Sequence, residues 1–125
     1  MRVLLDTHVA LWWFNDPALL SPDARAALED QGTTAYLSAA SVWEAGIKEA
    51  TGKLTSPTPL VEAARRTGVR ELTVDWTHAQ RAAELPPLHS DPFDRMLVAQ
   101  ALVEDLVLVT RDPLVTQYDV ATLPA

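Results

Sequence analysis

Four acidic side chains of this sequence could act together in one metal-dependent reaction. They are Asp6, Glu44, Asp94 and Asp112. Carboxylates gathered in a partly buried site repel one another and cannot all stay ionised without a counter-charge. Oxygen-only ligands favour hard cations, so we expect Mg²⁺, with Mn²⁺ as a substitute, rather than zinc. One or two such ions can activate water for in-line attack on a phosphodiester. The chemistry expected of this set is therefore phosphodiester hydrolysis, with all four acids as catalytic residues and metal ligands.

The two most apolar stretches predict strands that lead to two of these acids. Val3–Leu5 runs directly into Asp6, and Leu106–Val109 is followed by Thr110, Arg111 and Asp112. Unbroken apolar runs suit strands buried on both faces, as in parallel sheets. Open α/β sheets bind ligands at the carboxyl edge, where the strand order reverses. If these two strands are neighbours there, their acids share one edge.

The other two acids reach the same edge by way of helices. The strand-prone piece Thr34–Leu37 precedes a helix that is predicted to begin near Ser38–Ser41 and carries Glu44 near its start. Asp94 lies in the first turn of the longest predicted helix, Asp91–Asp105. In a βα unit the helix begins at the edge where the preceding strand ends. All four acids are therefore predicted to converge.

The remaining elements predict the fold class. Further helices are expected at Thr7–Phe14, Ser21–Asp30, Leu60–Thr67 and Asp75–Leu85, and further strands at Val69–Val74 and Val120–Leu123. Strands that alternate with helices imply right-handed βαβ crossovers and a sheet covered on both faces. We expect an α/β protein, an α/β/α sandwich with a central, mostly parallel sheet. Residues 1–125 are expected to form one domain, since no repeat or linker is visible.

Each acid also has an ordinary structural explanation. Asp6 could cap the helix that follows it, and Glu44 could close a capping box with Ser41. Asp94 suits the first turn of a helix, and Asp112 suits the start of a turn. Taken singly, these explanations are the better ones. The coincidence of all four acids at one predicted edge favours the metal site.

The basic residues near these acids leave two interpretations open. His8, His78 and His89 lack the spacing of metal ligands, and we expect none of them to bind metal. Arg95 and Arg111 each adjoin a candidate acid. They could hold the phosphates of a substrate, or they could simply neutralise part of the acidic charge.

Composition sets outer bounds on function. Of 125 residues, 48% are hydrophobic, which supports a real core, and no apolar stretch approaches the ~20 residues of a membrane span. Lys and Arg number 10 against 17 Asp and Glu, a net charge of −7, which argues against a broad basic surface that coats nucleic acid. The chain contains no cysteine and hence no disulfide. We expect a cytoplasmic protein without a signal peptide.

Aromatic residues and one long helix raise the question of partners. Trp12, Trp13 and Trp43 could pack in the core or line a groove for another protein. The helix Asp91–Asp105 is apolar almost all round, so it must be buried on more than one side. Its second side could contact another copy of the chain or another helix of the same chain.

Four stretches, in this order, match the pattern of a known family. They are Val-Leu-Leu-Asp-Thr-His from Val3, Ser-Val-Trp-Glu-Ala-Gly-Ile-Lys from Ser41 with Gly-Lys-Leu after it, Asp-Pro-Phe-Asp-Arg-Met-Leu-Val-Ala-Gln-Ala from Asp91, and Leu-Val-Thr-Arg-Asp from Leu108. Together they resemble the PIN-domain ribonucleases, with the greatest similarity to the VapC toxins of prokaryotic toxin–antitoxin pairs. The resemblance covers nearly the whole chain.

The resemblance implies a PIN-like fold, a magnesium-dependent endoribonuclease that cleaves RNA, a VapB-like antitoxin as partner, and a homodimer. Asp6, Glu44 and Asp94 match the core acidic ligands of the family, and Asp112 matches its fourth, more variable acid. Asp91 matches the approach to the helix rather than the ligand set. The family often has an aromatic residue shortly after the fourth acid, whereas Pro113 follows here.

Two other functions compete with the ribonuclease. A receiver-like signalling domain also has an acidic Mg²⁺ pocket, but it would need an acid pair near the first strand and a lysine after a late strand. Asp6 has no acidic neighbour, and Lys48 and Lys53 both lie mid-chain. A catalytically inactive PIN-like binding module is the second alternative, and the retention of all four acids argues against it.

Overall fold

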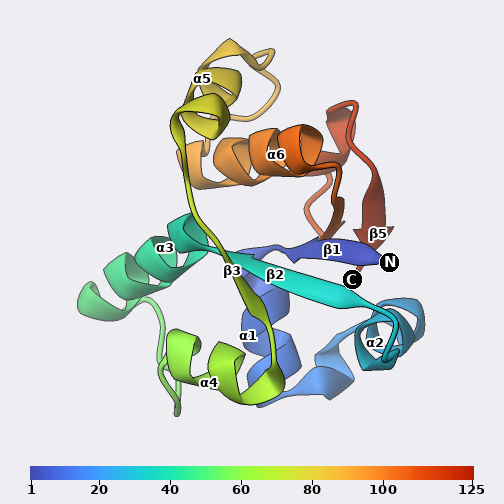
Figure 1. Ribbon diagram of the computed structural model, residues 1–125. Helices are drawn as coiled ribbons and strands as arrows, with labels where there is room; N and C mark the ends of the chain where they lie inside the picture. The colour runs from blue at the N-terminus through green and yellow to red at the C-terminus, as the bar shows by residue number, and fades with distance from the viewer.

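The two most apolar runs of the sequence lie side by side at the centre of a parallel sheet. The computed structural model describes residues 1–125 and contains five strands in the order β3-β2-β1-β4-β5 (Figure 1). Strand β1 (Arg2–Leu5) pairs with β2 (Thr34–Ser38) on one side and β4 (Val107–Thr110) on the other. The edge strands are β3 (Arg70–Leu72) and β5 (Thr122–Pro124). The strand order reverses between β1 and β4, so the predicted switch point is confirmed.

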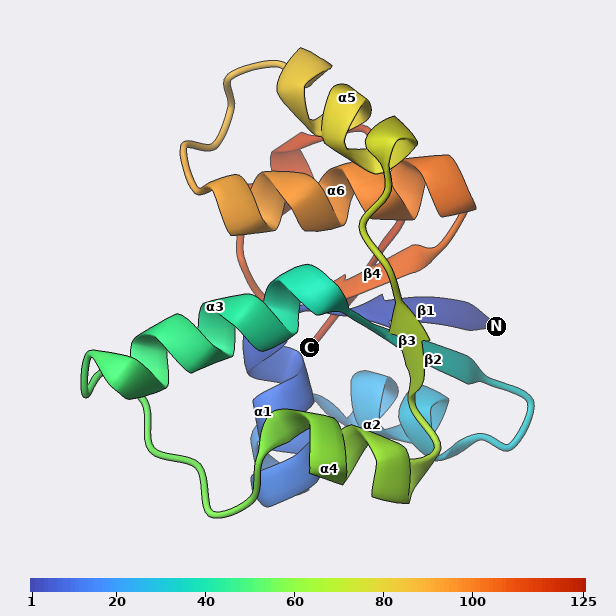
Figure 2. The ribbon, with the colours of Figure 1, turned by 60° about the vertical axis from the view of Figure 1, so that its left-hand side comes forward.

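Helices cover both faces of this sheet. Helices α1 (Thr7–Asn15), α2 (Pro22–Glu29) and α4 (Leu60–Thr67) lie on one face, and α5 (Trp76–Glu84) and α6 (Pro92–Glu104) lie on the other (Figure 1). Helix α3 (Ala39–Ala50) runs outward from the carboxyl end of β2 (Figure 2). Two short 3₁₀ helices are also present: η1 (Pro17–Leu19) between α1 and α2, and η2 (Val115–Gln117) between β4 and β5. The predicted α/β/α sandwich is confirmed.

The unbroken apolar run of β1 is explained by burial on both faces. Val3 and Leu5 pack in the cluster that includes α1, α2 and α4, whereas Leu4 packs in the cluster of α5 and α6. All three side chains are fully buried. Because alternate strand residues point to opposite faces, a strand between two helical layers must be apolar at every position. Each such side chain contributes about 1.5–3 kcal/mol through burial.

Helix α6 owes its apolar character to its place between the sheet and α5. Leu97, Val98, Ala99 and Ala101 are buried in the same cluster as Ala82 of α5. Its second apolar side is therefore covered by a helix of the same chain, the simpler of the two predicted alternatives. None of the helices is long and apolar enough to cross a membrane.

Local differences from the predicted elements have specific causes. Ser41 is not a helix cap, because the helix begins earlier: the Ser38 side chain accepts a hydrogen bond from Ala40 N at 3.1 Å. The predicted strand Val69–Val74 is paired only over Arg70–Leu72, since β3 is an edge strand. Asp91 is the N-cap of α6, and its side chain accepts hydrogen bonds from the backbone N–H groups of Phe93 and Asp94.

Candidate metal centre

The four predicted acids lie around one cleft at the carboxyl edge of the sheet. Asp6 follows β1, Glu44 is on α3, Asp94 is in the first turn of α6, and Asp112 follows β4. All four line a single cavity of about 420 Å³. Its other lining residues are His8, Val9, Trp12, Lys48, Asp91 and Arg111. The structure therefore brings the predicted residues together, and their role as ligands remains a prediction.

Asp6 lies at the floor of the cleft and is held by the neighbouring strand. Its side chain is 9% exposed, and its Oδ2 atom accepts a hydrogen bond of 2.8 Å from the Thr110 hydroxyl. The carboxylate makes no capping hydrogen bond with α1, so the N-cap explanation of this residue is not supported. Burial raises the pKa of Asp6, the Thr110 hydrogen bond and the nearby His8 oppose this only in part, and the charge of Glu44 adds a smaller upward contribution.

Glu44 is fixed on both of its oxygens. Thr7, the first residue of α1, donates from its hydroxyl to Oε1 at 2.7 Å, and Lys48 donates to Oε2 at 2.9 Å. Glu44 and Lys48 therefore form an i,i+4 ion pair that lies partly inside the cleft. Burial lowers the pKa of Lys48, but the hydrogen bond and charge of Glu44 outweigh it and the net shift is upward.

Asp94 shows most directly that negative charge accumulates here. Burial, followed by the charges of Asp6, Asp91 and Glu44, raises the pKa of Asp94 to about 7 from an ordinary 3.8. An acid displaced that far is buried among like charges that the nearby basic side chains do not fully offset. Functional sites are where such displacements concentrate, so the electrostatics support a bound cation.

His89 joins this site although its spacing in the sequence gave no sign of it. Its Nε2 atom lies 2.8 Å from Oδ2 of Asp94 and 3.1 Å from Oδ2 of Asp112. Burial lowers the pKa of His89, but its hydrogen bonds to the two acids and their charges outweigh it, and the net shift is upward. Within the sequence, the one hint was that His89 precedes the helix cap Asp91 by only two residues.

The two candidate arginines are both held by backbone oxygens, and only Arg111 lines the cleft. The guanidinium of Arg95 donates to the carbonyl of Ala82 in α5, to backbone carbonyls of the loop before α6 and to Tyr118 Oη. Arg111 donates to the carbonyl oxygens of Leu19 and Ala125 and lies 4.3 Å over the Trp12 ring. Phosphate binding by Arg95, one of the two predicted alternatives, is therefore wrong. Its donors are already used by backbone oxygens.

The donor set fits a hard divalent cation. Carboxylates of Asp6, Glu44, Asp94 and Asp112 are the acidic groups that converge, with Asp91 beside them as the cap of α6. Lys48 neutralises Glu44, and no cysteine is present. Oxygen-rich sites of this kind suit Mg²⁺ or Mn²⁺.

Comparison with known proteins agrees with this geometry. The sequence profile described as PIN domain matches residues 3–121. This chain belongs to the PIN domain family. Ribonuclease VapC22 of Mycobacterium tuberculosis (strain ATCC 25618 / H37Rv) is 32% identical over 113 residues, which are 88% of this chain and 86% of that protein.

Solved structures share the fold of this PIN domain. VapBC2 from Rickettsia felis, bound to a DNA fragment from its promoter, matches with a TM-score of 0.73 and 14% identity over 100% of this chain and 99% of that one. DNA-bound VapBC from Salmonella typhimurium matches with a TM-score of 0.71 and 14% identity over 99% and 98%. These two similarities establish the architecture alone.

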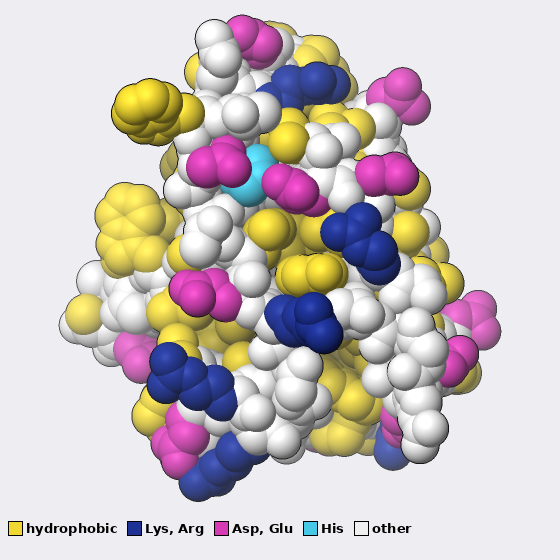
Figure 3. Space-filling model, viewed as in Figure 1, with side chains coloured by type: hydrophobic (Ala, Val, Ile, Leu, Met, Phe, Trp, Pro, Cys, Tyr) yellow, Lys and Arg dark blue, Asp and Glu magenta, His cyan; other side chains and the backbone are white.

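A large apolar surface borders the acidic cleft of this PIN domain. We call it the α3/α6 surface. It is lined by Ala39, Ala40, Trp43, Ile47, Val74, Pro92, Phe93 and Met96. Trp43 is 67% exposed and packs edge-on against Phe93, with ring centroids 5.3 Å apart. Figure 3 shows large apolar side chains standing out on the side where α3 and the start of α5 lie, whereas charges of both signs are interspersed over the rest of that view. Exposed apolar area of this kind marks an interaction site.

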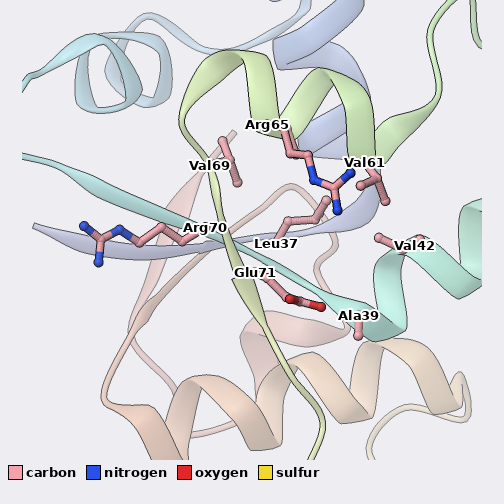
Figure 4. A pocket seen from close by; sticks show the side chains of 9 residues that line it. Leu37, Ala39, Val42, Val61, Arg65, Val69, Arg70 and Glu71 are labelled. Atoms are coloured by element: carbon pink, nitrogen blue, oxygen red, sulfur yellow. The ribbon is translucent and has the colours of Figure 1, made fainter.

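Two other features of this PIN domain do not resemble the acidic cleft. A cavity of about 110 Å³ lies between α3, α4 and the β2–β3 edge, lined mainly by apolar side chains, with Arg65 and Glu71 directed toward it (Figure 4). His78 is fully buried. Its Nε2 donates to Glu104 Oε1 at 2.8 Å, and its Nδ1 accepts from Asp75 N to complete the capping box of Asp75. Both features are explained by packing and helix capping.

Proposed function

We propose that this PIN domain is a metal-dependent endoribonuclease that hydrolyses RNA phosphodiester bonds in the cytoplasm. The observation that carries the proposal is the convergence of four acids in one cleft, with the pKa of Asp94 raised to about 7 by burial and by the charges of its acidic neighbours. The similarity to ribonuclease VapC22 supports RNA as the substrate. We propose Asp6, Glu44, Asp94 and Asp112 as the catalytic, metal-binding residues.

Each acid has a distinct part in holding the reaction centre. When bound, Mg²⁺ or Mn²⁺ supplies the charge that activates water and stabilises the attacked phosphate. Thr110 orients Asp6, and Thr7 with Lys48 orients Glu44, so both carboxylates are fixed before any ligand arrives. Such fixed ligands spare the site the cost of reorganising when the metal and substrate bind.

The test is an RNA cleavage assay with a panel of structured and unstructured RNAs. We expect cleavage with Mg²⁺ or Mn²⁺ and none with excess chelator. The Ser90→Ala variant is the matched control and should cleave RNA like the wild type, because the exposed Ser90 side chain makes no hydrogen bond in the structure. Undiminished cleavage in chelator would exclude the metal mechanism.

The structure offers little to the two competing functions. A receiver-like domain would need a lysine near the ends of the late strands, whereas Lys48 is on α3 and pairs with Glu44. An inactive binding module would tolerate loss of an acid or of its supports. Here every acid is retained, and both Asp6 and Glu44 keep their hydroxyl partners.

We further propose that the chain is the toxin of a VapBC-like pair and binds a small VapB-like antitoxin. The α3/α6 surface adjoins the cleft, because Trp43 and Phe93 are the sequence neighbours of Glu44 and Asp94. An amphipathic antitoxin helix could lay its apolar face on this surface. A basic side chain beyond that helix would then reach the acids and satisfy the charge that a metal otherwise neutralises.

Co-expression with the neighbouring small open reading frame tests this pairing. We expect the partner to co-purify and to suppress the growth arrest caused by the chain alone. Trp43→Ala should weaken inhibition by ~2 kcal/mol or more and leave RNA cleavage in place, since an exposed anchor tryptophan contributes that much. If no partner co-purifies and growth is unaffected, the toxin assignment fails even where cleavage persists.

The predicted homodimer belongs to the same proposal and has its own measurement. Light scattering on the chain alone should give twice the monomer mass. Loss of the dimer in Trp43→Ala would assign the α3/α6 surface to a second copy of the chain, whereas an intact dimer in that variant leaves the surface to the antitoxin.

A further inference from the structure

His89 stands where two of the proposed metal ligands come closest. Its Nε2 atom lies between the Oδ2 atoms of Asp94 and Asp112, at 2.8 Å and 3.1 Å. These three atoms, one nitrogen and two carboxylate oxygens, all lie within 4.8 Å of one another. Two carboxylates at this separation need a shared positive or hydrogen-donating group. The imidazole supplies that group from the chain itself.

The contact made by the other ring nitrogen, Nδ1, shows whether Nε2 of His89 donates a hydrogen bond or could coordinate a metal. The backbone N–H of Asp91 donates to Nδ1 of His89 at 3.3 Å, so Nδ1 carries a lone pair and the proton of a neutral ring lies on Nε2. A metal ligand would need the reverse, a bare Nε2 with the proton on Nδ1. The hydrogen bonding of His89 therefore fits a donor to the two acids and opposes a metal ligand.

The loop that carries His89 is fixed by contacts of its own. Tyr118 Oη accepts a hydrogen bond from His89 N at 3.0 Å and donates to Pro86 O at 2.9 Å. Arg95 donates to Tyr118 Oη at 3.2 Å and to carbonyls of the same loop, Leu85 O among them at 3.0 Å. Held at several points, the loop presents the imidazole to the acids in one position.

We propose that His89 is a positioning residue that takes the place of a second cation, so that the cleft binds one divalent ion per chain. Its N–H holds Asp94 and Asp112 together. It contacts only Oδ2 of Asp94, so Oδ1 would stay available, with Asp6 and Glu44, to hold the ion. Asp112, whose Oδ2 faces His89 and whose Oδ1 accepts from Leu114 N, would then act through His89 instead of as a direct ligand, which narrows the role proposed for it above. The inference rests on the metal-dependent function proposed above and specifies how many ions that function uses.

The number of bound Mn²⁺ ions tests this directly. Calorimetric titration, with electron paramagnetic resonance of the bound ions, should give one ion per chain for the wild type and for Ser90→Ala, a control in the same loop. His89→Ala should bind a second ion, seen as spin coupling between two Mn²⁺, because the Asp94 and Asp112 carboxylates lose their shared donor. His89→Gln should restore one ion, since its amide N–H can donate to both acids.

Circular dichroism first establishes that both variants are folded. Two coupled ions in the wild type would overturn the inference, and so would a single ion in His89→Ala. A tenfold or greater loss of affinity for the first ion in both variants would make His89 a ligand and overturn it as well. If the wild type cleaves RNA yet binds two ions, only this inference fails. If it neither cleaves RNA nor binds Mn²⁺, the proposed function fails too.

Discussion

Replacing Asp94 by Asn should abolish RNA cleavage and, without metal, make the protein more stable. The pKa of Asp94 is about 7 in the folded protein and 3.8 ordinarily, so ionising it costs the folded state more than the unfolded one. The full difference corresponds to about 4 kcal/mol at 1.36 kcal/mol per unit. The carboxylate is 15% exposed in an open cleft, where water and salt screen the repulsion, so we expect roughly 1–2 kcal/mol.

The pH dependence follows from the sign of this shift. Because the folded pKa is raised, the penalty is absent below the unfolded value of 3.8, grows as the pH rises, and is complete above about 7. Asn cannot ionise, and its side-chain oxygen still accepts the hydrogen bond from His89. The gain in stability should therefore be largest near pH 8 and shrink toward pH 5.

Thermal unfolding in chelator at those two pH values, paired with RNA cleavage assays, measures both effects. A gain of 1–2 kcal/mol corresponds to a melting temperature higher by roughly 4–8 °C. Added Mn²⁺ should stabilise the wild type and reverse the order, because only the wild type keeps the full ligand set. An Asn variant that cleaves RNA at the wild-type rate, or that is less stable than wild type in chelator near pH 8, would refute the reasoning.

Three further outcomes follow from the structure. Hydrolysis by water should leave 5′-phosphate and 3′-hydroxyl ends, so mass analysis of the fragments should find no cyclic phosphate and a 2′-deoxy substitution at the cleaved position should be tolerated. Thr7→Val should cost about 1–3 kcal/mol and weaken Mn²⁺ binding, because Glu44 Oε1 loses its donor, whereas Thr7→Ser, which keeps the hydroxyl, should behave as wild type in urea unfolding and metal titration. Gly68→Ala should destabilise by about 1 kcal/mol in the same urea assay without changing cleavage, because Gly68 ends α4 with φ at 76°, and equal stability would contradict this.

The central strands and several helices could be predicted from the sequence, because apolar runs and helix-ending residues mark them locally. The apolar runs at Val3–Leu5 and Leu106–Val109 predicted two neighbouring central strands, and the structure pairs them. The helix Leu60–Thr67 was predicted to the residue, since Pro59 precedes it and Gly68 ends it. Period and capping are local properties, so a single sequence records them.

Exposure of the aromatic residues depended on which side of a helix faces the core. Glu44 is 5% exposed and Trp43, one residue earlier, is 67% exposed. Neighbouring helical residues point about 100° apart, so turning Glu44 inward directs Trp43 outward. The sequence allowed either orientation, and only the packing of α3 against α1 and α6 decides it.

The place of His89 could not be predicted, because it depends on contacts between distant segments. Its loop has no period, and its shape is set by Tyr118 and Arg95, which hold the loop from other elements. The same holds for Arg111, which reaches the carbonyls of Leu19 and Ala125. Such tertiary hydrogen bonds leave no pattern of spacing in a sequence.

The central position of β1 has a consequence for how this protein is made. A ribosome delivers β1 first among the strands, yet β1 pairs with β4, and Asp6 is hydrogen-bonded to Thr110, 104 positions later. The floor of the cleft therefore cannot form on a nascent chain that still lacks β4. Long-range pairing of this kind completes late in folding. A partly synthesised chain thus carries all the helices up to α6 and three of its acids, but no assembled centre with which to attack the RNA around it.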